Sequence, residues 1–130
     1  MPGPSEEDSV TDRPRFEDWL DEIKRGSESA RIGMYLMHNG VVRGTTRDGS
    51  LVTGMDLSCD RDHLLEVVTR IEAMPGVVAL RVWVNQGRLV VGDDIMRVLV
   101  AGDIRENVFG ALQELVRLIK TECVSEQEST

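Results

Sequence analysis

The sequence predicts an α+β fold in which helices pack against a mainly antiparallel β-sheet. Segments with a helical apolar period alternate with short β-rich runs, and their order along the chain is αββαβββα. Short stretches that contain Gly and Asp separate the β-rich runs, as is typical of antiparallel strands. The chain has no Rossmann or P-loop glycine pattern, so nothing indicates a nucleotide-binding parallel sheet.

A short helix and two strands are expected first. Apolar residues at positions 16, 19, 20 and 23 follow the helical spacing, and the predicted helix ends at Gly26. Residues 32–42 and 51–57 are β-rich runs, and the Asp48-Gly49 pair between them is a hairpin signal. We therefore expect two strands joined by a mobile loop.

The second half begins with a helix over residues 60–74, which stops at Pro75-Gly76. Three β-rich runs follow, and their short connections predict a meander of antiparallel strands. These runs are residues 77–84, 88–91 and 95–101.

The last helix has the strongest amphipathic pattern in the chain. Asp103 and Glu106 have the spacing of a capping box, and a continuous apolar stripe that includes Phe109 extends the helix to Lys120.

Charge divides the chain into one domain and two tails. Residues 1–14 hold four acids and one base, and residues 121–130 hold three acids and no base, so six of the eight net negative charges lie in the tails. We predict a disordered acidic tail over residues 1–14, a single α+β domain over residues 15–120, and a frayed acidic tail over residues 121–130. The domain itself is close to neutral and can hold a cationic site.

Several classes of function have little support. The chain has neither a basic run nor a long apolar segment, so we expect no binding to nucleic acid or to membranes. Cys59 and Cys123 stand alone, without a CxxC or Cys/His cluster, which favours a reduced cytoplasmic setting and inert thiols. His38 and His63 have no catalytic partner at a recognisable spacing, so we expect no metal site and no resident cofactor.

Four cations stand at the ends of predicted elements: Arg43 and Arg47 in the first hairpin, Arg105 at a helix start and Lys120 at its end. Guanidinium groups bind phosphate through two parallel hydrogen bonds, and a lysine among other cations can serve as acid, base or nucleophile. These cations predict a phosphorylated ligand, with Lys120 catalytic and the three arginines binding substrate. The alternative is that Lys120 caps the helix C-terminus, Arg47 pairs with Asp48 and the others are solvated.

Several short motifs, read in order between residues 16 and 120, resemble the large, catalytic subunit of molybdopterin synthase. No single motif is specific, and the resemblance rests on their order and spacing. The motifs are Gly33 followed by Gly40-Val41-Val42-Arg43, Gly49 with Val52, Gly87-Arg88-Leu89-Val90-Val91-Gly92-Asp93, Arg105 to Phe109, and Ile119-Lys120.

The resemblance implies an α/β hammerhead-type fold and a central homodimer in which each protomer binds a small ubiquitin-like sulfur-carrier subunit. The thiocarboxylate at the carrier's Gly-Gly end would sulfurate cyclic pyranopterin monophosphate, giving the dithiolene of molybdopterin in molybdenum or tungsten cofactor biosynthesis. By the same resemblance, Arg43 and Arg105 would hold the phosphate or pterin end of the substrate, and Lys120 would match a pocket lysine.

Four residues at three places in the chain depart from the family pattern. Val84-Asn85 stands where the family has His-Arg, Ile104 stands where a histidine precedes Arg105, and about Gln127 stands where the family has a second pocket lysine. We favour a molybdopterin synthase-type sulfurtransferase with an incomplete active site. The alternatives are a catalytically deficient paralogue that binds a pterin, a carrier or another dimer, and a structural interaction module whose cations are incidental.

Overall fold

A three-stranded antiparallel sheet forms the centre of the fold in the computed structural model, which describes residues 13–130. Its strands lie in the order β1-β5-β3, and β5 pairs with both neighbours. The bounds are Met34–Val41 for β1, Val77–Val84 for β3 and Asp94–Gly102 for β5.

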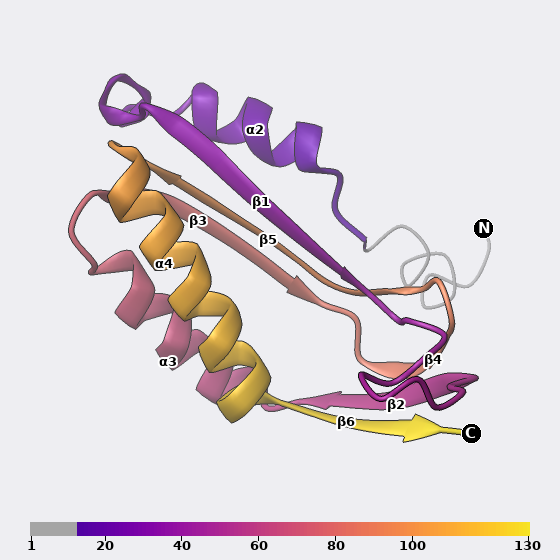
Figure 1. Ribbon diagram of the computed structural model, residues 1–130. Coiled ribbons are helices and arrows are strands. Elements are labelled where there is room, and N and C mark those ends of the chain that lie inside the picture. The colour runs from indigo at the N-terminus through magenta and orange to yellow at the C-terminus, as the bar shows by residue number, and fades with distance from the viewer. Residues whose placement is uncertain (1–12) are drawn as a thin grey trace, which may run out of the picture.

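Helices cover both faces of this sheet, as Figure 1 shows. α2 (Phe16–Lys24) lies on one face, and α3 (Arg61–Glu72) and α4 (Arg105–Leu118) lie on the other. A short 3₁₀ helix, η1 (Ser29–Arg31), precedes β1. No helix in the described part of the chain is both long and apolar enough to cross a membrane.

The central strand β5 is buried on both faces, which explains its unbroken apolar run. Val98 and Val100 face the main core beneath α3 and α4, whereas Leu99 and Ala101 face a smaller core beneath α2. All four side chains are completely inaccessible to solvent. A strand covered on one face alternates apolar with polar residues, but a strand covered on both faces does not.

A second three-stranded sheet stands at one end of the first. β2 (Gly54–Cys59) lies between β4 (Gly87–Val90) and β6 (Val124–Ser129), and all pairs are antiparallel. Figure 1 shows this small sheet beyond the start of β5, and β6 reaches it directly from the C-terminal end of α4. The α+β class and the antiparallel pairing expected from the sequence are therefore confirmed.

The strand partners differ from the predicted hairpin and meander. β1 and β2 belong to different sheets, and only an isolated bridge between Thr45 and Leu51 closes the loop between them. β4 pairs with β2 and not with β3 or β5, so the predicted meander does not form. β3 pairs directly with β5. Both expectations were wrong because apolar period and turn residues identify a strand without identifying its partner.

The C-terminal segment is ordered where the sequence predicts a frayed tail over residues 121–130. A π-helical turn, η2 (Ile119–Cys123), follows α4, and β6 then pairs with the full length of β2, from Gly54↔Ser129 to Cys59↔Val124. Backbone hydrogen bonds to β2 hold this acidic strand, and such bonds need no apolar pattern. Of the predicted N-terminal tail, only Arg13 and Pro14 lie within the described residues.

The start of α4 also differs from the predicted capping box. Asp103 accepts hydrogen bonds from the backbone N–H of Ile104 (2.6 Å) and the side-chain amide of Asn107 (2.9 Å), and Glu106 takes no part. The N-cap residue is Ile104, which has no side chain that can cap the helix. Phe109 is 51% exposed and so lies outside the buried stripe in which the sequence places it.

Candidate functional site

A cavity of about 450 Å³ opens between residues of the two sheets, the loop after β1 and the turn that follows α4. This volume lies in the usual range for small-ligand pockets. Its walls come from the end of β1, the loop after it, β2, β5, η2 and β6. We call it the cation pocket, and its lining residues are Val41, Arg43, Thr45, Thr46, Arg47, Met55, Ile95, Lys120, Glu126 and Glu128.

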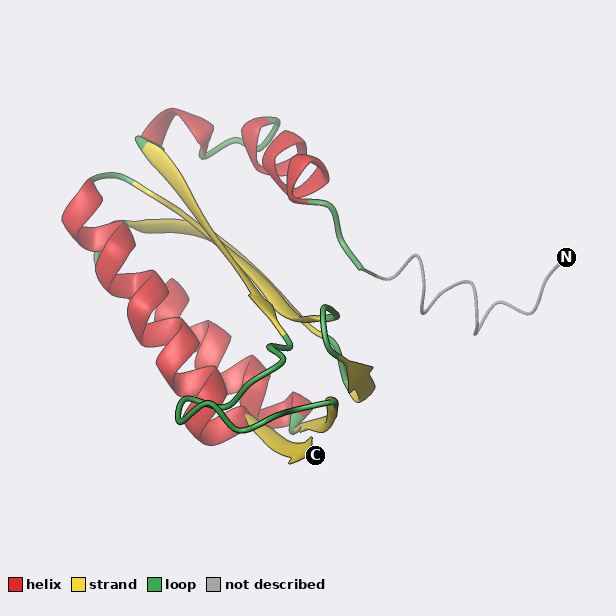
Figure 2. Cartoon of the chain, turned by 45° about the vertical axis from the view of Figure 1, so that its right-hand side comes forward, coloured by secondary structure: helices red, strands yellow, loops and turns green. Residues whose placement is uncertain are grey.

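The loop between β1 and β2 presents two arginines to the cation pocket. It folds back on itself through a hydrogen bond from Val52 N–H to the carbonyl of Gly44 (2.9 Å). The Nε of Arg43 donates to the Thr45 carbonyl (3.0 Å), which directs the guanidinium along the loop. Arg43 and Arg47 line the same cavity as Lys120. Figure 2 draws the loop that carries the two arginines in green.

Hydrogen bonds within the loop fix its tip. The Asp48 carboxylate accepts from the backbone N–H of Ser50 (3.1 Å) and its hydroxyl (2.9 Å), and from the hydroxyl of Thr46. These hydrogen bonds, of which that from Thr46 has the largest effect, lower the pKa of Asp48. Asp48 has no ion pair with Arg47 among the described residues, so Arg47 is available to a ligand.

Lys120 lies in the π-helical turn and pairs with an acid from β6. Its Nζ lies 2.7 Å from Oε2 of Glu126, and the two side chains are 42% and 22% exposed. His38 lies nearby on the α4 side of the sheet, since it pairs with the buried Val98 across an antiparallel ladder. Burial, and then the positive charge of Lys120, lower the pKa of His38.

Arg105 lies apart from the other predicted site residues. It is the first residue of α4, whereas Lys120 follows the last, and fifteen residues of helical rise separate them by about 22 Å. Arg105 does not line the cation pocket. The structure therefore brings Arg43, Arg47 and Lys120 together in one chain and leaves Arg105 at the opposite end of the helix.

The four residues that depart from the family pattern, Val84, Asn85, Ile104 and Gln127, also lie outside the cation pocket. Gln127 points to the other face of β6, where it lines a shallow surface depression with Arg88 and Ser125. Val84 is buried in the core, and the side-chain amide of Asn85 donates to the backbone carbonyl of Asp94 (2.9 Å).

Two acids that line the cation pocket, Glu126 and Glu128, were not predicted from the sequence to be site residues. Glu126 and Glu128 alternate with Ser125 and Gln127 along β6, so both acids face the pocket. The alternation of these acids with Ser125 and Gln127 was the only sign of a strand in this part of the sequence. It was not recognised as one because residues 125–130 contain no apolar residue.

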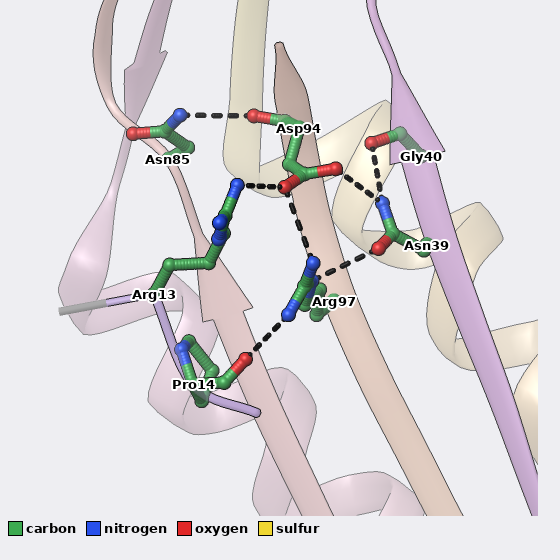
Figure 3. Close-up of polar contacts among 7 residues, drawn as sticks. All are labelled: Arg13, Pro14, Asn39, Gly40, Asn85, Asp94 and Arg97. Carbon is green, nitrogen blue, oxygen red and sulfur yellow. Dashed lines mark hydrogen bonds and ion pairs between the residues drawn. The ribbon is translucent and has the colours of Figure 1, made fainter. Parts of the chain in front are cut away.

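A polar network, drawn in Figure 3, ties the N-terminal segment to the sheet near the pocket. The Asp94 carboxylate accepts from Asn39 (2.9 Å) and Arg13 (2.9 Å), and it also lies 3.3 Å from Arg97, which donates to the Pro14 carbonyl (2.6 Å). Burial raises the pKa of Asp94, but the hydrogen bonds from Asn39 and Arg13 and the charge of Arg97 together lower it below its ordinary value. Ile95, the next residue, lines the cation pocket.

His63 in α3 contacts the π-helical turn that contains Lys120 and so holds this turn against α3. The Nε2 of His63 lies 2.8 Å from Glu122 in η2, and its Nδ1 lies 3.1 Å from Glu66. The contact with Glu122 is the main reason why the pKa of His63 is raised. At the end of the same turn, burial raises the pKa of Cys123 to about 11, which makes this thiol a poor nucleophile at neutral pH.

A family model described as "MoaE protein" matches residues 15–122. The chain belongs to the MoaE protein family. This confirms the resemblance to molybdopterin synthase large subunits and supports a role in molybdenum cofactor biosynthesis. No curated protein sequence matches the chain.

Solved structures share the fold at low sequence identity. Molybdopterin synthase from Staphylococcus aureus has a TM-score of 0.71 at 17% identity, over 90% of this chain and 86% of the other. A molybdopterin biosynthesis MoaE protein from Burkholderia ambifaria has a TM-score of 0.69 at 21% identity, over 90% and 78%. A complex of subunits 1 and 2 of molybdopterin-converting factor from Helicobacter pylori has a TM-score of 0.64 at 14% identity, over 88% and 78%.

Proposed function

We propose that this MoaE family member is a molybdopterin synthase-type sulfurtransferase. In this proposal a thiocarboxylated carrier protein supplies sulfur to cyclic pyranopterin monophosphate, and the product is molybdopterin. The observation that carries the proposal is the cation pocket, in which Arg43, Arg47 and Lys120 converge from positions far apart in the sequence. A phosphorylated metabolite matches both the size and the positive charges of this cavity.

The two arginines are the proposed phosphate ligands. Both stand on the folded loop after β1, where their guanidinium groups can offer paired N–H donors to phosphate oxygens. Lys120 is the proposed catalytic residue. Its ammonium can stabilise negative charge that develops on the reacting atoms, and Glu126 at 2.7 Å can take up or return a proton.

Arg105 takes part in this proposal only through a homodimer. It lies about 22 Å along α4 from Lys120, so it can reach a substrate in the cation pocket only from a second copy of the chain. Two exposed apolar side chains stand beside it, Ile104 (52% exposed) and Phe109 (51%). Such residues favour burial against another protein surface.

A small sulfur-carrier protein is the proposed second partner. The structure from Helicobacter pylori is of a two-subunit molybdopterin-converting factor. Leu51 (67% exposed), which is bridged to Thr45, and Val91 (45%), which lies beside Gly44, offer apolar surface for docking next to the loop that lines the cation pocket. A Gly-Gly terminus has no side chains to obstruct its approach to Lys120.

The second candidate function is a binding protein that has lost turnover. The ion pair between Lys120 and Glu126 favours this second function. A lysine whose charge is balanced by a carboxylate of its own chain binds an anion less strongly and stabilises less negative charge on a reacting atom. Gln127, at the family's second lysine position, points away from the cavity and supplies no cation.

One assay separates the two functions. The chain is incubated with cyclic pyranopterin monophosphate and a thiocarboxylated Gly-Gly carrier, and mass spectrometry follows the addition of two sulfur atoms to the pterin. Sulfur incorporation supports the synthase. Binding of substrate or carrier without sulfur incorporation supports the binding protein. If the chain neither binds these molecules nor incorporates sulfur, both proposals are wrong.

A further inference from the structure

The cation pocket is lined by two acids as well as by its three basic residues. Glu126 and Glu128 stand two residues apart on β6, so their side chains emerge on the same face of the strand. Their partners across the ladder are Leu57 and Met55, both buried, so this face of β6 is the one turned toward the body of the molecule. On it Glu126 is partly buried and Glu128 is exposed. Both carboxylates line the cavity.

Only one of the two acids has an ion-pair partner in the described chain. Glu126 neutralises Lys120 at 2.7 Å and retains a second carboxylate oxygen. Within residues 13–130, Glu128 makes no hydrogen bond through its side chain and no ion pair, and the same holds for Arg47, which also lines the cavity. The charges open to a ligand are therefore arginines on the loop side and a carboxylate on the β6 side.

Three aliphatic side chains line the cavity beside its charged residues and the polar Thr45 and Thr46. Met55 and Ile95 are buried, with 4% and 7% of their surface exposed, and Val41 adds a third aliphatic surface. Aliphatic side chains suit the faces of a flat ring, whereas the polar edges of that ring need hydrogen-bonding partners. The cavity thus fits a planar heterocycle with an anion at one end and hydrogen-bond donors at the other.

A pterin has such a donor edge. Its 2-amino-4-oxo-pyrimidine ring places a ring N–H beside an exocyclic amino group, and a carboxylate can accept both hydrogen bonds in parallel, as it does from a guanidinium. We propose that Glu128, with Glu126 beside it, binds the aminopyrimidinone edge of the pterin, while Arg43 and Arg47 hold the phosphate. This inference rests on the proposed pterin substrate and adds its orientation.

The opposite orientation is unfavourable. A phosphate placed against β6 would lie beside two carboxylates of like charge, and the donor edge would face guanidinium groups that have only donors. Charge and hydrogen bonding therefore select the same direction for the substrate. In this direction Lys120, which lies beside Glu126, is near the ring system rather than the phosphate.

The test uses two probes, neopterin, which has no phosphate, and inorganic phosphate, titrated into the full chain by calorimetry. Glu128→Gln keeps the size of the side chain and removes its charge. We expect neopterin affinity to fall about tenfold or more, the usual effect of losing a charge-assisted pair of hydrogen bonds. Phosphate affinity is expected to hold or rise, because a repulsive charge has been removed.

Glu72→Gln is the matched control. Glu72 is exposed at the end of α3, has no ion pair in the described chain, and the substitution changes net charge by the same amount. It is expected to leave both affinities unchanged. Circular dichroism checks that each variant folds, and Glu126→Gln gives an independent second measurement at the same wall.

The outcomes separate this inference from the proposed function. Neopterin binding by the natural chain that Glu128→Gln and Glu126→Gln leave unchanged would overturn the assigned orientation and leave the proposed function intact. Absence of neopterin binding by the natural chain would overturn both. Selective loss of neopterin binding in the β6 variants, with phosphate binding retained, supports the inference even if no sulfur transfer is found.

Discussion

Lys120 and Glu126 lie 2.7 Å apart although they belong to different elements, the π-helical turn and the strand that follows it. The pair joins the proposed catalytic lysine to a strand that has no apolar pattern. Because both side chains are partly solvated, the pair contributes little to folding. Its significance lies in the charge of the cation pocket, which has three basic and two acidic side chains.

Replacing Lys120 with Ala should reduce sulfur transfer about a hundredfold or more, because the pocket loses its proposed charge-stabilising group. The midpoint of thermal unfolding should change little, since the ion pair is partly exposed. Steady-state kinetics and calorimetric unfolding measure the two effects. Lys24→Ala, on α2, is the control and should retain activity; equal losses in both variants would remove Lys120 from the mechanism.

Mixing two inactive variants tests whether the site is shared between subunits. In a heterodimer of Arg105→Ala with Lys120→Ala, one of the two sites regains both natural residues. If subunits exchange randomly, the mixture should recover about a quarter of natural activity, since half of the dimers would each have one intact site. Analytical ultracentrifugation confirms the dimer, and a mixture as inactive as its components would place Arg105 outside the site.

The two histidines should titrate on opposite sides of the ordinary histidine pKa. Contact with Glu122 raises the pKa of His63, whereas burial and Lys120 lower that of His38. NMR titration should show Glu122→Gln lowering the His63 value and Lys120→Ala raising the His38 value. The His63 contact stabilises the fold fully below about pH 6.5 and loses this effect as pH rises through the raised pKa. An unmoved His38 resonance would contradict the placement beside Lys120.

Asp94→Asn should destabilise the fold by about 1–3 kcal/mol at neutral pH, because Arg13 and Arg97 lose their shared charged acceptor. The pKa of Asp94 is lowered in the folded state, so its contribution is present above about pH 4 and is lost as pH falls through the lower folded value. Urea unfolding at pH 7 and pH 3 should therefore show a difference between natural and variant chains that shrinks in acid.

Two glycines should respond to alanine in opposite directions. A Cβ on Gly54 would lie 2.5 Å from the carbonyl oxygen of Leu89, so Gly54→Ala should cost about 1–3 kcal/mol and loosen the small sheet. A Cβ on Gly110, exposed within α4, meets nothing within 4 Å, so Gly110→Ala should stabilise the helix by about 0.5–1 kcal/mol. Denaturant unfolding measures both, and equal effects would contradict the close approach at Gly54.

The helices and most strand positions could be predicted from the sequence because their signals are local. The apolar period of α4 and the stop at Pro75-Gly76 needed no knowledge of distant residues. Strand partners could not be predicted in this way, since a run such as β4 has the same alternation whether it pairs with β3 or with β2. β6 was missed because it has no apolar run and forms its strand chiefly by backbone pairing with β2.

The candidate site was predicted in part for the same reason. Arg43, Arg47 and Lys120 stand at element ends, where sequence reasoning looks for binding residues, and they share one cavity. The distance of Arg105 from this cavity follows from the straight helix between it and Lys120. The acids at positions 126 and 128 could not be assigned to the cavity without the path of β6.

The length of the five-residue π-helical turn determines which side chains of β6 face the cavity. Deleting one residue between Lys120 and Val124 would move every later residue one position back along β6, so that Gln127 and Ser129 took the places of Glu126 and Glu128 opposite Leu57 and Met55. An indel in this turn would thus make the cavity wall neutral without any substitution in the strand. Turn length is therefore a route by which homologues sharing this backbone could differ in ligand preference.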